Sequence, residues 1–570
     1  MNVLGINPTM RSWYGTRWGN HDPSATLVTN GQVANAAEEE RFVRIKRAPK
    51  PHFPARSVEF VLTENDMDLS NIDVIAIGWD HSNLVNQFQL LKEFNPPSLF
   101  GLDRLYKTLK TAYAVKRNNQ IQQIEIKLKQ LNLGCFDGKY IEVSHHRSHA
   151  ASAAYCSGYD DQIIITMDGA GEGEATVIWD ADLNRIAQFS TSNSLGLFYH
   201  AGCEFLGFRW VDAGKVMGLA SYGEYDEQIA EVFANYTSSD NGQYDVTNFQ
   251  NGNYEIWKQE LGFERSRGEP ITQTHKNFAF HLQLTLEKIV KDLISFYVNS
   301  TGVGQIAIAG GVAMNCKLNR EIKNMEVVEE LFVQPAANDT GISLGCALEA
   351  HRQCVGTAPE VNLNNVYFGP KYSDRDIETV LKNNKLEFTK YSENKVCSEV
   401  AKLLANQKLV GWFQGQMEFG ARALGNRSIL ADPRSHEMRD NVNYNVKKRE
   451  SWRPFAPSIL YDQSREFLKY GDEANYMIIL DEVKKSKQQG VAAITHVDGT
   501  TRPQTVRKEQ NQKYYNLINE FYKITGVPLI LNTSFNVAGE PIVESPNQAI
   551  ADFYRTGLDA LAIGNYLLKK

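Results

Sequence analysis

The chain has 570 residues, of which 42% are hydrophobic and 22% are charged, and its formal net charge at pH 7 is −7. This length exceeds one ordinary core, so two or more domains are expected, and the composition is that of a globular protein. The negative charge excludes a general attraction to nucleic acid or anionic membrane, and no apolar run is long enough to cross a bilayer.

The first residues and the cysteines favour a cytoplasmic protein. The opening stretch, MNVLGINPTMRSWYG, lacks the basic head and continuous apolar segment of a signal peptide. Seven cysteines, an odd number, are scattered without any CxxC pair. This pattern fits reduced thiols and argues against zinc ribbons or a disulfide framework.

Strand-like and helix-like segments alternate from the start of the chain. We expect strands at 2–7, 24–29, 33–42, 72–79, 139–143, 162–180 (two strands around a glycine turn), 305–311 and 330–335, and helices at 103–133, 145–156, 276–299, 314–322 and 340–352. The mixture predicts an α/β architecture. A polar stretch with two prolines at 356–372 predicts a boundary between domains at 1–360 and 361–570.

The stretch SHHRSHA, residues 144–150, holds three of the 12 histidines of the chain. On a helix, His145 and His149 share one face, a spacing that suits two ligands of a borderline metal, while His146 points elsewhere. The alternative is a polar helix start with chance histidines. Asp339, where a strand turns into a helix, is either a helix cap or a carboxylate that completes the site.

Three glycine turns favour a nucleotide site in the first domain. They span Asp168–Gly173, Asp212–Lys215 and Gly310–Asn315, and each is interpreted as following a strand. Glycine lets backbone N–H groups approach a phosphate closely. The absence of a GxxxxGK[ST] motif argues against a P-loop NTPase.

His21 lies in the loop between the first two predicted strands. It is either a general base or a loop histidine that hydrogen-bonds Asp22 to hold the turn. The acidic run Glu38–Arg41 after the second of these strands is interpreted as a solvated strand end, with Lys46 just beyond it.

The second domain carries the densest chemical signal. Basic residues are interleaved with apolar ones, and three polar residues follow a predicted strand near the C-terminus; these residues are Arg422, Arg427, Arg434, Lys447, Lys448, Arg449, Arg453 and Arg502, then Asn532, Ser534 and Asn536. A charge run is usually a solvated face, but the interleaving favours a lined pocket. The fork of arginine suits carboxylates and phosphates, so we predict a buried anion site.

These motifs together resemble the NodU/CmcH family of carbamoyltransferases, which includes aminoglycoside O-carbamoyltransferases. The resemblance covers nearly the whole chain in order: HDPSA, EEERF, the HHxxH run, DGAGE, GKVMGLASYG, GGVAMN, MEFGARALGNRSILADPR, RPFAPS, HVDGT, RPQTV and LNTSFNVAGEPIV.

The resemblance implies a fold and an activity. The N-terminal domain is expected to be two-lobed and of actin/sugar-kinase type, like the tRNA threonylcarbamoyl transferases, and the C-terminal domain to be YrdC-like. Carbamoyl phosphate and ATP, with Mg, would form carbamoyl-adenylate in the C-terminal domain. The carbamoyl group would then pass, in the N-terminal domain, to a hydroxyl of a natural product such as an antibiotic, a toxin or an oligosaccharide.

The resemblance also implies roles for particular residues. Arg422, Arg453, Arg502, Asn532 and Ser534 would hold carbamoyl phosphate and the ATP phosphates, and Lys447 would neutralise charge as pyrophosphate forms. The other implied groups are Lys46, Asp168, Gly169, Gly310, Gly311 and Asn315 for the nucleotide, His145, His149 and Asp339 for Fe(II) or another divalent metal, and His21 as the base.

Three alternatives remain at this stage. A maturation factor of the HypF kind would carry an acylphosphatase-like domain and CxxC motifs, which this chain lacks. A small-molecule kinase on the actin/sugar-kinase fold leaves the arginine-rich domain unexplained, and a nucleotide-binding regulator would need no turnover. The acceptor, the role of the Trp13–Trp18 loop and the oligomeric state, for which a homodimer is one option, stay open.

Overall fold

The computed structural model describes residues 1–9, 21–49, 52–80, 121–361, 363–450 and 452–570. Within them no helix combines the length and the apolar character needed to cross a membrane. The Trp13–Trp18 loop and most of the helix expected at 103–133 lie outside the described residues, whereas 121–129 are helical.

The N-terminal part contains two five-stranded sheets with the same topology. The first has the order β3-β2-β1-β4-β5, from β1 (Asn2–Asn7), β2 (Ser24–Thr29), β3 (Gln32–Glu38), β4 (Val74–Ile77) and β5 (Lys139–Glu142). The second has the order β12-β11-β6-β7-β8, from β6 (Ile163–Gly171), β7 (Glu174–Trp179), β8 (Arg185–Ser190), β11 (Gln305–Ala309) and β12 (Glu330–Val333). In each, two of the four strand pairings are parallel and two are antiparallel, so that one strand, β2 or β7, runs against the other four. This duplication is the expected two-lobed, actin/sugar-kinase-like fold.

Two helices fill the space between these sheets. α5 (His145–Ser157) and α12 (Ile342–Val355) pack on each other, α12 against β1, β2 and β4 and α5 against β6 and β11. Their approach requires glycine, because a Cβ on Gly345 would lie 1.7 Å from the carbonyl oxygen of Ser148. Gly345 of α12 and the small residues of α5 let the two helices pack closely, so the N-terminus of α5 and its histidines lie deep between the lobes.

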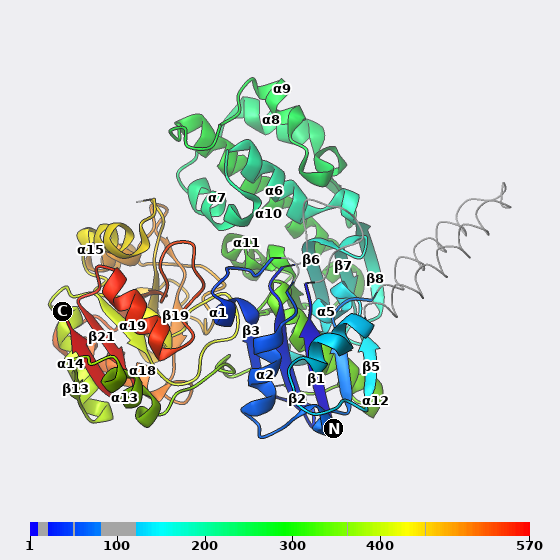
Figure 1. Cartoon of the computed structure of the whole chain (residues 1–570). Helices are drawn as coiled ribbons and strands as arrows, with labels where there is room; N and C mark the ends of the chain where they lie inside the picture. The colour runs from blue at the N-terminus through cyan, green and yellow to red at the C-terminus, as the bar shows by residue number, and fades with distance from the viewer. Residues whose placement is uncertain (10–20, 50–51, 81–120, 362, 451) are drawn as a thin grey trace.

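The other helices of the two lobes lie outside this central pair (Figure 1). In the first lobe these are α1 (Glu39–Val43) and α2 (Ala55–Thr63). In the second lobe they are α6 (Leu195–Phe205), α7 (Ala213–Ala220), α8 (Glu227–Tyr236), α9 (Glu255–Leu261), α10 (Gln273–Thr301) and α11 (Cys316–Lys323), with the hairpin β9 (Ser238–Asp240) and β10 (Gln243–Asp245). The strand expected at 33–42 was wrong in its second half, because the chain turns into α1 after Glu38.

The C-terminal part is built on one mixed eight-stranded sheet, seen beside the two lobes in Figure 1. Its order is β13 (Thr389–Lys390), β22 (Tyr566–Lys569), β21 (Ala560–Ile563), β14 (Val410–Phe413), β15 (Arg427–Ala431), β20 (Leu529–Ser534), β16 (Ala456–Leu460) and β19 (Gln504–Val506). Apart from it, β17 (Asp481–Glu482) pairs with β18 (Thr500–Thr501).

Helices cover both faces of this sheet. α13 (Asp374–Asn383) and α19 (Pro546–Arg555) pack in one apolar cluster, and α14 (Glu393–Ala405) and α18 (Gln512–Thr525) in another. Three short helices, α15 (His436–Asn441), α16 (Ser464–Phe467) and α17 (Lys485–Gln488), lie in the connections. The predicted domain boundary near residue 360 stays a prediction.

Candidate functional site

Four metal-ligating side chains converge where the two N-terminal lobes meet. His145 and His149 are one turn apart on α5, and their Nε2 atoms lie 3.1 and 3.2 Å from the same Oδ2 of Asp168, which lies on β6. Asp339 begins the turn that leads into α12, and its Oδ1 is 3.7 Å from Nε2 of His149. One ligand atom from each of the four lies within 4.8 Å of all the others.

Burial and charge act strongly on this cluster. Burial opposes protonation of His149, but hydrogen bonds to Asp168 and Asp339, together with their charges, raise its pKa to about 9. Burial also opposes ionisation of Asp168, yet the two histidines hold the pKa of that carboxyl well below its ordinary value. Two imidazoles and two carboxylates are a donor set for a borderline divalent cation, so these residues fit a metal ion.

Sequence reasoning found three of these four ligand candidates. The structure brings His145, His149 and Asp339 together, as a metal site would require, although ligation itself remains a prediction. Asp168 had been expected to contact the nucleotide, and its position at the end of a buried strand was the available signal for a second role. His146 points away, as expected: its Nδ1 is 2.9 Å from Thr166 Oγ1, and burial holds its pKa well below the ordinary value.

His21 lies at the edge of the same cluster. Its Nδ1 is 2.9 Å from Asp22 Oδ2 and 3.7 Å from Asp339 Oδ2, and its ring stacks on Trp210 at 5.2 Å. Burial opposes protonation, but Asp339 and Asp22 outweigh it and raise the pKa of His21. The hydrogen bond to Asp22 is the one that the turn-holding interpretation expected, and the contact with Asp339 places the imidazole beside the metal ligands.

Two of the glycine turns lie together at the ends of β6 and β11. A Cβ on Gly310, whose φ is +94°, would lie 2.2 Å from the carbonyl oxygen of Met167, so only glycine allows this approach. A Cβ on Gly311 would lie 2.9 Å from Oδ1 of Asp168, and the N–H of Gly169 donates to that same Oδ1 at 2.7 Å. The predicted nucleotide residues Asp168, Gly169, Gly310 and Gly311 are therefore neighbours.

The third predicted turn is different. Asp212 and Gly214 do not follow a strand, because they lie where a short 3₁₀ turn passes into α7. Lys215 of this helix reaches the C-terminal part, with its Nζ 3.1 Å from Glu450 Oε1. The interpretation of this stretch as a post-strand phosphate loop was wrong, and its lysine joins the two parts of the chain.

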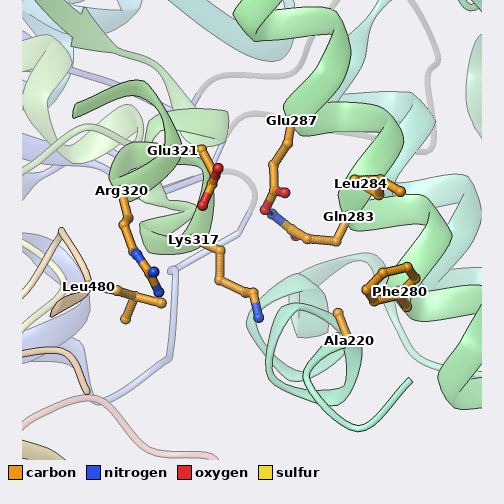
Figure 2. Close-up of a pocket in the computed structure, with 9 residues that line it drawn as sticks. All are labelled: Ala220, Phe280, Gln283, Leu284, Glu287, Lys317, Arg320, Glu321 and Leu480. Carbon is orange, nitrogen blue, oxygen red and sulfur yellow. Dashed lines mark hydrogen bonds between the residues drawn. The ribbon is translucent and has the colours of Figure 1, made fainter. Parts of the chain in front are cut away.

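Asn315 connects the glycine turns to a pocket of about 210 Å³ between α10 and α11. Its amide exchanges hydrogen bonds of 3.0 and 3.2 Å with the amide of Gln283. Figure 2 shows Gln283 and Glu287 of α10 facing Lys317 and Glu321 of α11 across this pocket. Gln283 also donates to Glu287 at 2.7 Å, so the polar wall continues from Asn315 into the cavity.

A second site is built around Lys447 in the C-terminal part. Its Nζ donates to the carbonyl oxygen of Asn536 at 3.1 Å and to Asn536 Oδ1 at 3.0 Å, and it also contacts the hydroxyl of Ser534 at 3.2 Å. Burial holds the pKa of Lys447 well below its ordinary value, and Arg449 lowers it further. The ammonium group of Lys447 is thus held by neutral oxygens of Asn536 and of the predicted Ser534.

Three arginines crowd beside one another near this lysine. Loss of hydration and the charge of Arg502 lower the pKa of Arg422 to about 9. Loss of hydration also lowers the pKa of Arg453, and the nearby charge of Arg502 adds to the shift although Glu450 opposes it. Cations that repel each other in a partly buried position favour binding of a polyanion.

Lys46 belongs to the same positive region although it comes from the first lobe. Loss of hydration lowers the pKa of Lys46 despite the opposing charge of Glu40, and Arg453 lowers it further. The charge of Lys46 in turn lowers the pKa of Lys447. Lys46 therefore lies at the junction between the two parts of the chain, and its contact with a nucleotide phosphate stays a prediction.

Several residues of the predicted basic pocket bind other groups of the protein. Arg427 is fully buried and donates to the carbonyl oxygens of Gln414 at 2.5 Å and Pro370 at 3.0 Å. Arg434 pairs with Asp432 at 2.6 Å. Asn532, expected to bind substrate, donates through its amide to the carbonyl oxygen of Ala423 at 3.2 Å, next to Arg422. These contacts shape the pocket.

Sequence reasoning also missed two buried glutamates. The acidic run at Glu38 is not a solvated strand end, because Glu38 is only 3% exposed, and burial raises its pKa to about 7. Glu418 is fully buried, and its Oε1 accepts the backbone N–H groups of Leu424 at 2.7 Å and Asn426 at 2.8 Å. A carboxylate that binds several N–H groups fixes a loop, here the one that carries Arg422.

Two family models match this chain, one described as the carbamoyltransferase N-terminus over residues 14–348 and the other as the carbamoyltransferase C-terminus over residues 401–570. The chain therefore belongs to the carbamoyltransferase family, the enzymes that transfer a carbamoyl group. Among its relatives, nodulation protein NolNO of Sinorhizobium fredii is 39% identical over 561 residues, which cover 96% of this chain and 79% of the relative. Nodulation protein NolO of Bradyrhizobium diazoefficiens is 40% identical over 443 residues, covering 75% of this chain and 79% of the relative.

Solved structures resemble the chain only weakly. Full-length HypF in a phosphate- and nucleotide-bound form aligns with a TM-score of 0.34 and 15% identity, over 63% of this chain and 56% of that one. Component A of the (R)-2-hydroxyglutaryl-CoA dehydratase of Acidaminococcus fermentans aligns with a TM-score of 0.32 and 13% identity, over 62% of this chain and 98% of that one. Likenesses of this strength carry no argument about function.

Proposed function

We propose that the chain is an ATP-dependent O-carbamoyltransferase that makes carbamoyl-adenylate from carbamoyl phosphate and ATP, with Mg, and passes the carbamoyl group to a hydroxyl of a natural product. The observation that carries this proposal is the cluster of buried and partly buried cations around Lys447. Arg502 lies close enough to Arg422 and Arg453 to lower the pKa of both, and Lys46 adds a cation from the first lobe. Carbamoyl phosphate and ATP are polyanions that such a site would bind.

The adenylate would form in this basic site. Water releases phosphate from carbamoyl phosphate, an oxygen of the resulting carbamate bonds to the α-phosphorus of ATP, and pyrophosphate leaves. Arg422, Arg453, Arg502 and Ser534 hold the phosphates, and Lys447 neutralises the charge that develops on pyrophosphate. The YrdC-like character of residues 361–570 belongs to this proposal, as does the assignment of the transfer step to residues 1–360.

The transfer would occur beside the histidine cluster. The acceptor hydroxyl gives its proton to His21 as its oxygen bonds to the carbamoyl carbon, and the bond from that carbon to the AMP oxygen breaks. The glycine turns at Gly169, Gly310 and Gly311 would let the nucleotide approach the backbone closely, and Asn315 lies where the adjoining pocket begins. Since carbamoyl-adenylate reacts with water, enclosure between the lobes protects it.

A divalent ion, Fe(II) or another, held by His145, His149, Asp168 and Asp339 would supply positive charge near the leaving phosphate. The two carboxylates and two imidazoles suit such an ion, and His21 contacts one of the carboxylates. Asp22, held by Asn338 at 2.8 Å, orients His21 so that the imidazole faces the cluster.

The acceptor class is tested by supplying ATP, carbamoyl phosphate and candidate acceptors, and by following carbamoylated products by mass spectrometry. Amino sugars and oligosaccharides with free hydroxyls are expected to gain one carbamoyl group on oxygen. N-acetylated versions of the same sugars are the matched control, because they keep the hydroxyls but lack free amines. Carbamoylation of amines or tRNA alone would contradict a hydroxyl acceptor.

A further inference from the structure

The loop that carries Arg422 is held by side chains of the first lobe. Arg41 of α1 donates through Nη2 to the carbonyl oxygen of Gly420 at 2.6 Å, and the N–H of Gly420 donates to Oε1 of Glu38 at 2.7 Å. The same Nη2 of Arg41 also donates to Glu38 Oε1, at 3.2 Å. Both backbone polar groups of Gly420 are thus bound by one ion pair, which we call the Glu38–Arg41 clamp.

The clamp is buried, so its geometry is narrowly defined. Arg41 is 1% exposed and Glu38 is 3% exposed. Hydrogen bonds between charged groups and backbone, sheltered from water, are stronger and more directional than exposed ones. Position 420 favours glycine, because its φ is +112° and an added Cβ would lie 3.1 Å from the carbonyl oxygen of Pro335.

The place of the clamp connects the two candidate sites. Gly420 is two residues before Arg422, and Glu418 fixes the far side of the same loop. Pro335, against which Gly420 packs, opens the segment that ends at Asp339, a candidate metal ligand. The clamp therefore meets the arginine loop on one side and the metal-ligand segment on the other.

We infer that Glu38 and Arg41 are positioning residues for Arg422, so that anion binding in the C-terminal part depends on an ion pair of the N-terminal lobe. Neither side chain touches substrate. They act by fixing the position of the loop backbone at Gly420. Loss of their hydrogen bonds to Gly420 lets the guanidinium of Arg422 move relative to Lys447 and Arg453. This inference rests on the proposed function for its substrate, carbamoyl phosphate.

The test compares Arg41→Ala and Glu38→Ala with Arg44→Gln. Arg44 is a matched control, because it lies on the same segment and also crosses to the C-terminal part, binding Glu540 at 2.9 Å and the carbonyl oxygen of Ile542 at 2.8 Å, but it does not contact the loop. Affinity for carbamoyl phosphate is measured by calorimetry on the full chain, and its KM by pyrophosphate formation, with the thermal unfolding midpoint recorded alongside.

Both alanine variants are expected to raise the Kd and KM for carbamoyl phosphate by about 10- to 100-fold, because small displacements of a positioning group have effects of that size. Arg44→Gln should lower the unfolding midpoint to a comparable extent but keep the Kd and KM within about two- to three-fold of the wild type, because the partly exposed Arg44–Glu540 pair does not contact the loop. Glu38→Gln keeps an oxygen acceptor for the N–H of Gly420 and should recover most of the affinity. The comparison of Glu38→Gln with Glu38→Ala still tests the inference if Arg41→Ala does not fold.

Equal effects of Arg44→Gln and the clamp variants, or a Glu38→Ala variant with unchanged KM and Kd, would overturn the inference. A wild type that forms no pyrophosphate from ATP and carbamoyl phosphate, and does not bind carbamoyl phosphate, would contradict the proposed function itself. The two failures are therefore distinguishable.

Discussion

Replacing His149 with alanine is expected to abolish carbamoyl transfer while the first half-reaction continues. His149 contacts two carboxylates of the four-residue cluster, and the alanine variant removes one of four candidate ligands. Loss of a group that stabilises charge in the transition state lowers turnover on the order of 10²- to 10³-fold. Pyrophosphate formation should change by less than about three-fold, since the basic site contains none of these ligands.

His146→Ala is the matched control for this variant. His146 lies on the same helix and is equally buried, but its Nδ1 contacts Thr166 outside the cluster. Metal content of the purified protein provides a readout that does not depend on turnover: it should fall for His149→Ala and stay near the wild-type value for His146→Ala. Equal loss of metal and of transfer in both variants, or full transfer by His149→Ala, would contradict the metal assignment.

Replacing Arg422 with alanine is expected to have the opposite effect, a loss of pyrophosphate formation with the metal retained. Loss of hydration and the charge of Arg502 lower the pKa of Arg422 to about 9. Its removal takes a guanidinium fork from a phosphate-binding site, and the expected loss in kcat/KM is on the order of 10²- to 10³-fold. The rate of pyrophosphate release with ATP and carbamoyl phosphate measures it.

Two further arginine variants sharpen this result. Arg422→Lys keeps the charge but not the planar fork, so it should recover only part of the rate. Arg465→Ala removes an arginine whose side chain is 79% exposed, and it should behave like the wild type. Normal pyrophosphate formation by Arg422→Ala would show that the anion site lies elsewhere.

Local patterns predicted most of the elements around the candidate sites. The strands expected at 2–7 and 24–29 correspond to β1 and β2, and the helix expected at 276–299 lies inside α10. The spacing of His145 and His149 placed both on one helical face, because helical periodicity is local. The turn at Asp339 was found since a strand end followed by an Asn-Asp-Thr-Gly stretch is itself a local signal.

Long-range contacts explain what the pattern did not predict. Glu38 was interpreted as solvated because acidic runs usually are, but Gly420, 382 residues away, buries it. Arg427 and Arg434 carried the same signal as Arg422, and only the partners of their side chains separate them: carbonyl oxygens for Arg427 and Asp432 for Arg434. Charge pattern predicts that a basic region exists, whereas three-dimensional pairing decides which cations remain for a ligand.

The measurement that tests the central claim most directly is the identity of the product made from ATP and carbamoyl phosphate by the wild-type chain, with a divalent metal present and no acceptor added. The account predicts pyrophosphate that appears only with carbamoyl phosphate, together with inorganic phosphate and no ADP. ADP in place of pyrophosphate, with or without an acceptor, would contradict carbamoyl-adenylate formation and favour phosphoryl transfer by a kinase.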